Sequence, residues 1–317
     1  MAKESLESLV IDFLQYCEIE ANLSQGTIKM YYYYLLELIS FLKKELQKEK
    51  STVGDINDEN LRLYRVFLNR KISSKSKAPI KRSTQMNFLV SLRAFLRYLM
   101  LDRQMEVLSP EKVKLGKGQD RQIKVLTKEQ VELLLKEPDL IRVNGLRDRA
   151  IMELLFSTGT RVSELCNLNI SDLNLKTSEI SVLGKGRKVR VVFISEQAAW
   201  ALRAYLARRS LEVKPLFIRL KGPKPKDENA LRLSPRSVES LIKKYAQKAG
   251  LAIEPTPHTL RHTFATDLLR NGADLRSVQE LLGHKNVSTT QIYTHVTNPQ
   301  LREVHRKFHS GNRPRES

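Results

Sequence analysis

Apolar side chains in the first hundred residues recur at alternating steps of four and three, the spacing that gathers them on one face of a helix. Two runs show this spacing: Ile28, Tyr32, Leu35, Ile39 and Leu42, then Phe88, Leu92, Phe95 and Leu99. The pattern predicts an all-α N-terminal domain over residues 1–107, built as a helical bundle.

The helical periodicity stops after residue 107. A Ser109-Pro110 pair interrupts the chain, and Gly116 and Gly118 stand among lysines and arginines. Breaks of this kind are typical of a connection between domains. We therefore expect a basic linker over residues 108–124.

The second half of the chain mixes helical and strand patterns. Thr127 and Gln130 form a capping box before an apolar run, which predicts the start of a helix. On both sides of residues 184–188 the apolar positions recur at every second residue, which predicts a β-hairpin with a glycine-flanked, cationic turn. These patterns favour a mixed α+β domain over residues 125–317, mostly helical around a small antiparallel sheet.

Composition indicates the kind of partner. Lys and Arg number 55 against 35 Asp and Glu, which leaves a net charge of +20 and favours a polyanionic partner. Hydrophobic residues make up 41% of the chain, enough for ordinary globular cores. No apolar run approaches the ~20 residues of a membrane span. The start of the chain lacks a signal-peptide pattern and only Cys17 and Cys166 are present, so we expect a cytoplasmic protein.

Basic side chains form a set of candidate contacts to a nucleic-acid backbone. The candidate DNA-binding residues are Lys81, Arg82, Arg93, Arg97, Lys117, Arg187 and Lys188. Arg93 and Arg97 share one face of a predicted helix and could present it to phosphates. A solvated charged face on a packed helix explains such a stretch equally well.

The residues able to do chemistry suit phosphate without a metal. The sequence has no Walker A pattern, no dinucleotide-binding glycine pattern and no cluster of Asp and Glu spaced to hold magnesium. We therefore expect neither a metal nor a cofactor. Cations and hydrogen-bond donors are present instead: Arg161, Lys185, His258, Arg261, His284 and Tyr293. Groups of these types stabilise charge in phosphoryl transfer.

One predicted helix opens with Thr256 as its N-cap, which puts His258 and Arg261 on one face near a positive helix end. His258 and His262, four apart, also have the spacing of a metal pair. That interpretation is disfavoured because Thr stands where a zinc-protease helix needs Glu and no third ligand is evident. His262 is more typical of a packing or supporting residue.

Arg161 and Glu164 are three residues apart, so the carboxylate could orient the guanidinium. An ordinary surface salt bridge explains the same spacing. Tyr293 lies beside Ile292 and Val296, and a lone tyrosine in such a place is usually a core residue. Only the whole set of residues favours a catalytic role for it.

Taken in order, the motifs resemble those of the tyrosine recombinase (phage integrase) family, and within it most of all the Xer recombinases. They are TGTRVSEL at 158–165, GKG at 184–186, HTLRHTFAT at 258–266, LLGH at 281–284 and TQIYTHV at 290–296. The N-terminal helices are similar to the SAM-like core-binding domain of the family. The resemblance implies a C-shaped clamp of two domains on duplex DNA.

The resemblance also implies the chemistry. Tyr293 would attack a backbone phosphate to form a 3′-phosphotyrosyl link, with Lys185 as general acid for the leaving 5′-oxygen and Lys188 as its alternative. The implied catalytic set is Arg161, Lys185, His258, Arg261, His284 and Tyr293, supported by Glu164 and His262. A tail over about 297–310, with Leu301, Val304 and Phe308 at helical spacing, would link subunits into a homo-tetramer on two DNA sites. Packing of that tail on its own domain is the alternative, and a regulatory partner is left open.

Several functions share these motifs. Resolution of chromosome dimers by a Xer-type enzyme is favoured by the compact length and the tail, over an integrase or resolvase of a mobile element. A type IB topoisomerase would use a similar constellation without strand exchange. A DNA-binding protein without chemistry is the remaining alternative.

Overall fold

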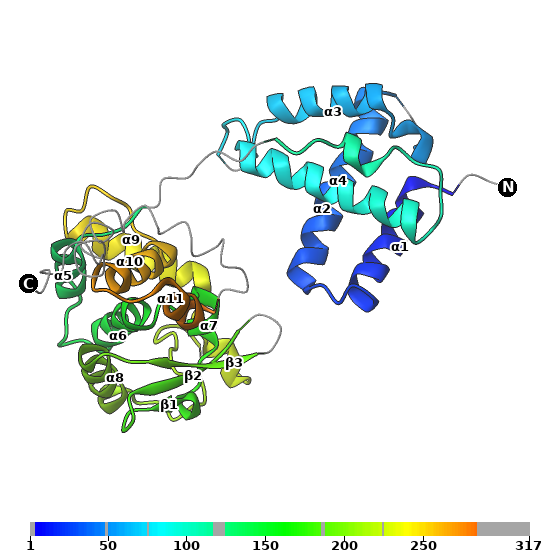
Figure 1. Cartoon of the computed structure of the whole chain (residues 1–317). Helices are drawn as coiled ribbons and strands as arrows, with labels where there is room; N and C mark the ends of the chain where they lie inside the picture. Colours follow the sequence, from blue (N-terminus) through cyan, green and yellow to red (C-terminus); the bar gives the residue numbers. More distant parts are fainter. Residues whose placement is uncertain are drawn as a thin grey trace, which may run out of the picture. The chain divides into compact units, whose positions relative to one another are not determined.

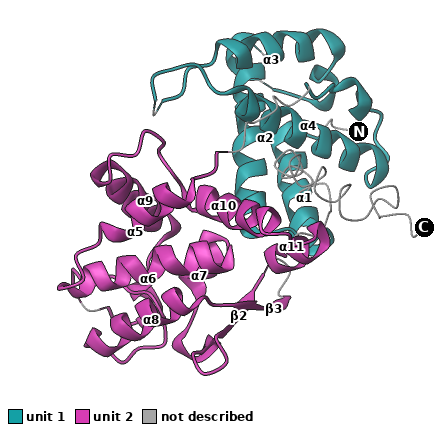
Figure 2. Ribbon diagram, turned by 60° about the vertical axis from the view of Figure 1, so that its left-hand side comes forward, with its two compact units in different colours: residues 1–120 teal, residues 121–317 magenta. Residues whose placement is uncertain are grey.

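The computed structural model describes residues 4–47, 50–74, 76–116, 124–184, 188–223 and 225–283 (Figure 1). The chain divides into two compact units, residues 1–120 and 121–317, which are coloured separately in Figure 2. Each unit has its own hydrophobic core. In the part of the chain that the structure describes, no helix is both long enough and apolar enough to cross a membrane.

Unit 1 is helical throughout its described elements. Its helices are α1 (Leu6–Ile19), α2 (Gln25–Glu45), α3 (Asp58–Arg70) and α4 (Arg82–Leu101). Short polar side chains start three of these helices, because Ser5, Ser24 and Asn57 each accept a backbone N–H from the first turn. The four apolar positions predicted on residues 88–99 are all buried, at 0–2% exposure. The expected all-α N-terminal unit is confirmed.

The buried face of α2 differs in one position from the prediction. Tyr32 was expected in the core but is 46% exposed, whereas Tyr34 is 5% exposed. Tyr31 stacks on Phe13 of α1 at 5.7 Å between ring centroids, and Tyr34 packs on Phe88 of α4 at 4.4 Å. These two rings fill the space toward the neighbouring helices, so Tyr32 is left on the outside.

Part of the range expected as a linker packs on unit 1. Pro110 begins a short 3₁₀ turn, Pro110–Lys112, and both Pro110 and Val113 are buried. Val113 belongs to the same core as Phe95 and Leu99. Single apolar residues that dock outside a regular helix carry no periodic signal, which explains why the pattern fails there.

Unit 2 is mainly helical around a small sheet. Its elements are α5 (Lys128–Lys136), α6 (Val143–Thr158), α7 (Val162–Asn167), β1 (Leu173–Asn174), β2 (Glu179–Leu183), β3 (Val189–Phe193), α8 (Glu196–Arg208), α9 (Pro235–Lys248), α10 (Pro257–Arg270) and α11 (Leu275–Leu282). Helix α6 is central, since its residues 150–152, 154 and 155 are fully buried. Helices α8, α10 and α9, among others, cover it (Figure 1).

Within the described residues, the sheet is antiparallel in the order β1-β2-β3, so β3 lies at its edge. In its register Ile180 pairs with Val192 and Val182 pairs with Arg190. Ile180, Val182 and Val192 are buried. Arg190 therefore lies on the inner face of the sheet. The predicted fold class, an all-α unit and an α+β unit with a small antiparallel sheet, is confirmed.

Candidate active site

The site is built on a sharp turn at the end of α6. Gly159 has φ +58°, and a Cβ placed there would lie 2.3 Å from Cδ1 of Phe264 on α10 and 3.1 Å from Cδ2 of Leu282 on α11. Only glycine fits a left-handed backbone under such close packing. Thr158 closes the turn, because its Oγ1 accepts the N–H of Thr160 at 3.3 Å. The turn thus brings α6, α10 and α11 to one point.

Arg261 of α10 reaches this point from inside the unit. Its side chain is buried, at 4% residue exposure. Nη1 donates to the carbonyl of Gly159, and Nη2 donates to the carbonyl of Leu282 at 2.7 Å. A buried guanidinium is costly unless it is hydrogen-bonded. Two backbone carbonyls therefore fix the orientation of Arg261.

Arg161 approaches the same point from the start of α7. Nη2 donates to the carbonyl of Gly283 at 3.3 Å, and Nη1 donates to Oε1 of Glu164 at 2.8 Å. The Arg161 side chain is 33% exposed while that of Glu164 is 5% exposed. Arg161 and Arg261 are thus anchored to successive carbonyls at the end of α11, and Arg161 keeps a face open to solvent.

Glu164 holds its place through two arginines. Its carboxylate accepts the backbone N–H of Arg161 at 2.9 Å as well as that residue's guanidinium. Arg190 of β3 forms the bidentate pair, with Nη1 to Oε1 at 3.1 Å and Nη2 to Oε2 at 2.7 Å. Burial is the largest single influence on this carboxyl and opposes its ionisation, but the hydrogen bonds and charges of Arg190 and Arg161 outweigh it and lower the pKa of Glu164.

Arg190 was missed by the sequence analysis. Its neighbours Val189, Val191 and Phe193 are apolar, so the period-two pattern puts Arg190 with the polar positions expected to face solvent. In the structure those three apolar side chains are 49–65% exposed, and Arg190 is 16% exposed. The pairing of Arg190 with the buried Val182 identifies its true face, and the chain alone gives no sign of that pairing.

The two described histidines lie on the first turns of α10, with ring centroids 6.4 Å apart. His258 is exposed. Burial, followed by the charges of His258 and Arg261, lowers the pKa of His262 to about 4. His262 is therefore neutral at physiological pH. Among the described residues, no group of three or more His, Cys, Asp and Glu lies together as a metal site would require.

Three of the predicted catalytic residues, Lys185, His284 and Tyr293, lie outside the described residues, as do Arg187, Lys117 and the tail 297–310. The described residues next to two of them lie at the site. Gly184 precedes Lys185, and its N–H donates to the carbonyl of Lys188 at 2.8 Å, which closes the stem of the hairpin. Gly283 precedes His284 and accepts from Arg161.

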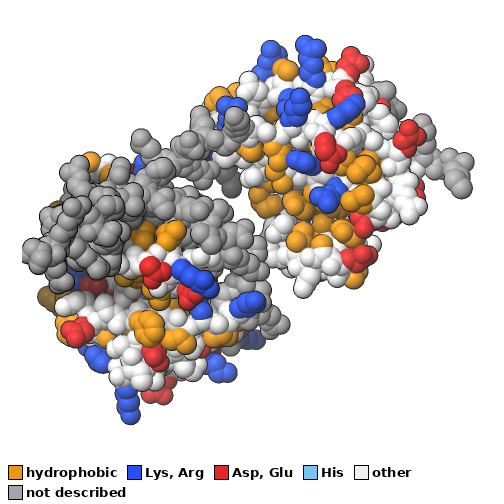
Figure 3. All heavy atoms as spheres, in the orientation of Figure 1, with side chains coloured by type: hydrophobic (Ala, Val, Ile, Leu, Met, Phe, Trp, Pro, Cys, Tyr) orange, Lys and Arg blue, Asp and Glu red, His pale blue; other side chains and the backbone are white. Residues whose placement is uncertain are grey.

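The predicted DNA-binding residues of unit 1 that the structure describes differ in their exposure to solvent. Lys81 and Arg82 are exposed at the start of α4. Arg97 is exposed and Arg93 is half-buried. The pKa of Glu111 is lowered, first by a hydrogen bond from Ser109 and to a smaller extent by the charges of Arg93 and Arg97. On the face of unit 1 drawn in Figure 3, Lys and Arg side chains alternate with acidic and apolar ones. In unit 2, Lys188 is exposed.

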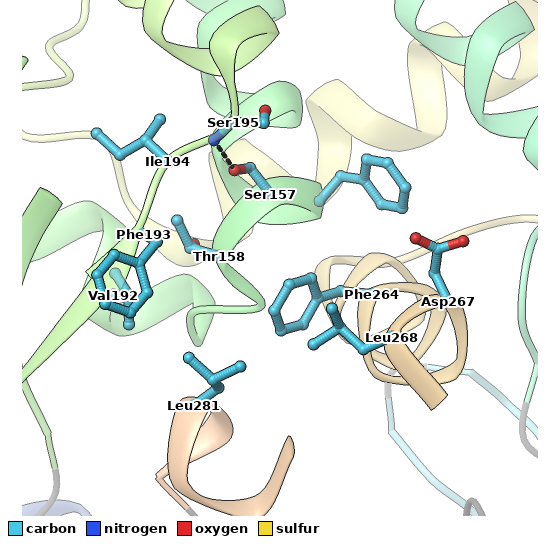
Figure 4. A pocket seen from close by; sticks show the side chains of 11 residues that line it. Ser157, Thr158, Val192, Phe193, Ile194, Ser195, Phe264, Asp267, Leu268 and Leu281 are labelled. Carbon is cyan, nitrogen blue, oxygen red and sulfur yellow. Dashed lines mark hydrogen bonds between the residues drawn. The ribbon is translucent and has the colours of Figure 1, made fainter. Parts of the chain in front are cut away.

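Beside the turn lies an apolar hollow of about 430 Å³ (Figure 4). Phe264 and Leu268 of α10, Leu281 of α11 and Phe193 of β3 line it, with Ser157 of α6 bonded to the N–H of Ser195 at 2.6 Å. The carboxylate of the exposed Asp267 stands at the same hollow. The hollow therefore offers an apolar floor and one negative charge.

Comparison with known proteins finds two matching family profiles. The phage integrase family matches residues 124–299, and the N-terminal SAM-like domain of phage integrases matches residues 10–103. The chain is 37% identical over 310 residues to the tyrosine recombinase XerD of Listeria monocytogenes, covering 96% of this chain and 99% of that one. It is 38% identical over 310 residues to the tyrosine recombinase XerC of Thermodesulfovibrio yellowstonii, with 95% of each chain covered.

The chain is also similar to a solved structure of a site-specific recombinase. The XerH site-specific recombinase, in a pre-cleavage complex bound to its difH substrate, has a TM-score of 0.66 and 25% identity to this chain. The match covers 93% of this chain and 83% of that one. Both units of the chain therefore have counterparts in one known protein.

Proposed function

Because the chain belongs to the phage integrase family and is a tyrosine site-specific recombinase, we propose that it resolves chromosome dimers in the cytoplasm as a Xer-type enzyme. Its substrate is a double-stranded DNA recombination site, which it cleaves and rejoins through a 3′-phosphotyrosyl intermediate. The observation that carries the proposed chemistry is the anchoring of Arg161 and Arg261 on the successive carbonyls of Gly283 and Leu282.

Arg161 and Arg261 stabilise the negative charge of the phosphate. Phosphoryl transfer needs in-line geometry and donors aimed at the nonbridging oxygens, where negative charge grows. Arg161 and Arg261 supply forked donors held by backbone carbonyls, so little reorganisation is needed when the substrate arrives. Arg161, Arg261 and Arg190 carry three positive charges, and Glu164 carries one negative charge. These four residues therefore have a net charge of +2.

The remaining proposed roles belong to residues that move protons or attack. Tyr293 is the nucleophile, and His258 and His284 donate hydrogen bonds to the phosphate and assist transfer of the tyrosine proton. Lys185 protonates the leaving 5′-oxygen, with Lys188 as the alternative acid. One phosphodiester is exchanged for another through the enzyme, so the mechanism consumes no ATP.

A covalent adduct tests the chemistry. The full-length protein first selects a tight-binding duplex from randomised DNA, and that duplex is then nicked near the cleavage position so that religation fails. In EDTA, we expect an adduct that survives SDS with the natural chain and none with Tyr293→Phe. Tyr16→Phe, in unit 1, is the matched control and should leave the adduct unchanged. A duplex that is bound but never linked to protein would overturn the proposal.

The topology of the products separates recombination from relaxation. A supercoiled plasmid with two copies of the selected site should yield recombinant circles. Relaxed plasmid without recombinants would assign the chain to strand rotation, as in a type IB topoisomerase. Accumulation of chromosome dimers in cells that carry Tyr293→Phe would support the Xer role over a mobile-element role.

The proposed assembly is a homo-tetramer on two DNA sites, linked by the tail. Leu301, Val304 and Phe308 recur at steps of three and four, with Arg306 and Lys307 between them. The hollow in Figure 4 is lined mainly by apolar side chains and holds the carboxylate of Asp267. An apolar and basic segment thus has a complementary apolar and acidic receptor, and we assign the tail of a neighbouring subunit to it.

A further inference from the structure

We propose that Arg190 is a positioning residue of the strand-transfer site. Its guanidinium fixes the carboxylate that orients Arg161 and packs against the two glycines from which the segments of Lys185 and His284 depart. The inference rests on the proposed function, because it assigns Arg190 to the same reaction.

The place of Arg190 on β3 makes this arrangement possible. Its side chain comes from the inner face of an edge strand, beside the buried Val182. At 16% exposure it is half as exposed as Arg161, at 33%. Both arginines bind Glu164, but the unit shields Arg190 while Arg161 is open to solvent. Arg190 is therefore the anchor, and Arg161 is the arginine available to a phosphate.

The shared carboxylate transmits this anchoring to Arg161. Each oxygen of Glu164 accepts one bond from Arg190 and one bond from Arg161. Without Arg190, the buried carboxylate would keep only the bonds of Arg161, and the guanidinium of Arg161 would be drawn toward it to compensate for burial. Arg161 would then turn away from the open face.

The same guanidinium lies between two backbone turns. Its Nε donates to the carbonyl of Leu281 at 3.3 Å. A Cβ at Gly283 would lie 3.1 Å from that Nε, and a Cβ at Gly184 would lie 3.3 Å from Nη1. Any side chain at either glycine would press on Arg190. The guanidinium of Arg190 thus lies between the base of the hairpin and the end of α11. Lys185 follows the first of these places in the chain, and His284 follows the second.

Substitution of Arg190 tests the inference on the full-length protein. Arg190→Gln and Arg190→Lys are compared with Arg203→Gln, which removes an exposed guanidinium bonded to the carbonyl of Leu175 elsewhere in unit 2. We expect duplex affinity within about threefold for all three. The single-turnover rate of adduct formation should fall about 100-fold for Arg190→Gln, the loss typical of a small misplacement of reacting groups. Arg203→Gln should react at the natural rate.

Lysine at position 190 separates geometry from charge. Its single ammonium cannot form the bidentate pair and the bond to Leu281 together. We therefore expect Arg190→Lys to be nearly as slow as Arg190→Gln. Full activity with lysine would show that only the charge matters and would overturn the positioning role.

A double-mutant cycle with Glu164→Gln tests whether Arg190 acts through that carboxylate. If Arg190 acts through Glu164, the double variant should form adduct about as slowly as the slower single variant. Rates that multiply would overturn the inference. Should Arg190→Gln fail to fold, Gly184→Ala crowds the same guanidinium, and its expected tenfold loss should disappear in the Arg190→Lys background. Failure of the natural chain to form any adduct would instead contradict the proposed function.

Discussion

Single residues place the charges of the site through the backbone. Arg261 donates to the carbonyls of Gly159 and Leu282, and Arg161 donates to that of Gly283. Carbonyls at turns move only when the main chain moves, so they hold a guanidinium more firmly than a flexible side chain does. The conformation of Gly159 therefore helps to place Arg261, a member of the proposed catalytic set, even though glycine has no functional group.

Substituting Gly159 should cost more than its backbone conformation alone. Gly159→Ala puts a Cβ 2.3 Å from the Phe264 ring at φ +58°, whereas Gly250 has φ +66° and nothing within 4 Å of its Cβ position. We expect about 1–2 kcal/mol of lost unfolding free energy for Gly250→Ala, and about 1–3 kcal/mol beyond that for Gly159→Ala from overpacking. Urea denaturation measures both, and equal losses would contradict the packing argument.

Local spacing in the sequence indicated the contact between Arg161 and Glu164, whereas the contact of Arg190 with Glu164 depends on strand pairing and was missed. The spacing of Arg161 and Glu164 allowed the carboxylate to orient the guanidinium, with an ordinary surface salt bridge as the alternative. The structure shows the bond, and the Glu164 side chain is buried, at 5% exposure. Arg190 reaches Glu164 from 26 residues away. No local spacing encodes that distance, since it depends on the register of β3 against β2.

Elements were predictable where their ends carry distinctive chemistry. Thr256 accepts the N–H of Thr259 at 3.2 Å, and Pro257 opens α10, as the sequence indicated. The strands were also predicted by their alternation. Which side of β3 faces inward was not, because Val191 and Phe193 lie on the exposed side, at 49% and 59%. Alternation fixes two faces but not which of them the helices cover.

The cap of α10 should matter for reaction as well as for stability. Thr256→Ala is matched by Ser234→Ala, since Ser234 caps α9 before a proline and accepts the N–H of Ser237 at 3.1 Å. Each change should lower the unfolding free energy by about 1 kcal/mol. Only Thr256→Ala should also slow adduct formation, by about tenfold, because the first turns of α10 carry His258 and Arg261.

Adduct rates on the nicked duplex and thermal unfolding of each variant provide the two readouts. A slow reaction with Ser234→Ala would mean that helix stability in general limits the rate. Unchanged reaction with Thr256→Ala would show that the proposed catalytic residues are held independently of the helix start.

At the scale of the whole molecule, the net charge of +20 predicted a polyanionic partner, and the similarity to a recombinase solved with its difH substrate supports DNA as that partner. The division into two units was expected from the loss of periodicity after residue 107. The boundary between them was not predicted in detail, because Pro110 and Val113 pack on unit 1 outside any regular α-helix. Assembly of several subunits leaves no signature in composition.

Charge reversal at the hollow tests the assembly. Asp267→Lys and Arg306→Glu, each made in the Tyr293→Phe chain, should weaken the complex of protein with two duplexes about tenfold, measured by sedimentation. Combining both changes should restore much of it if the two charges meet. Glu239→Lys, an exposed reversal on α9, is the control and should have no effect.

Mixing the two single variants shows whether the hollow binds the tail of its own subunit or that of a neighbouring subunit. Chains with Asp267→Lys mixed with chains with Arg306→Glu should assemble better than either alone when the tail crosses to a neighbour. If each tail binds its own subunit, mixing should change nothing, and the tetramer would need another contact.

The short helix α11 carries the carbonyls that receive both Arg161 and Arg261, together with one that receives Arg190. All three cations thus share one helix as part of their support, beside Gly159 and Glu164. A shift of α11 by a fraction of its width would disturb every guanidinium at once, and its return would restore them at once. We therefore expect a displacement of α11 to change the positions of all three guanidinium groups together.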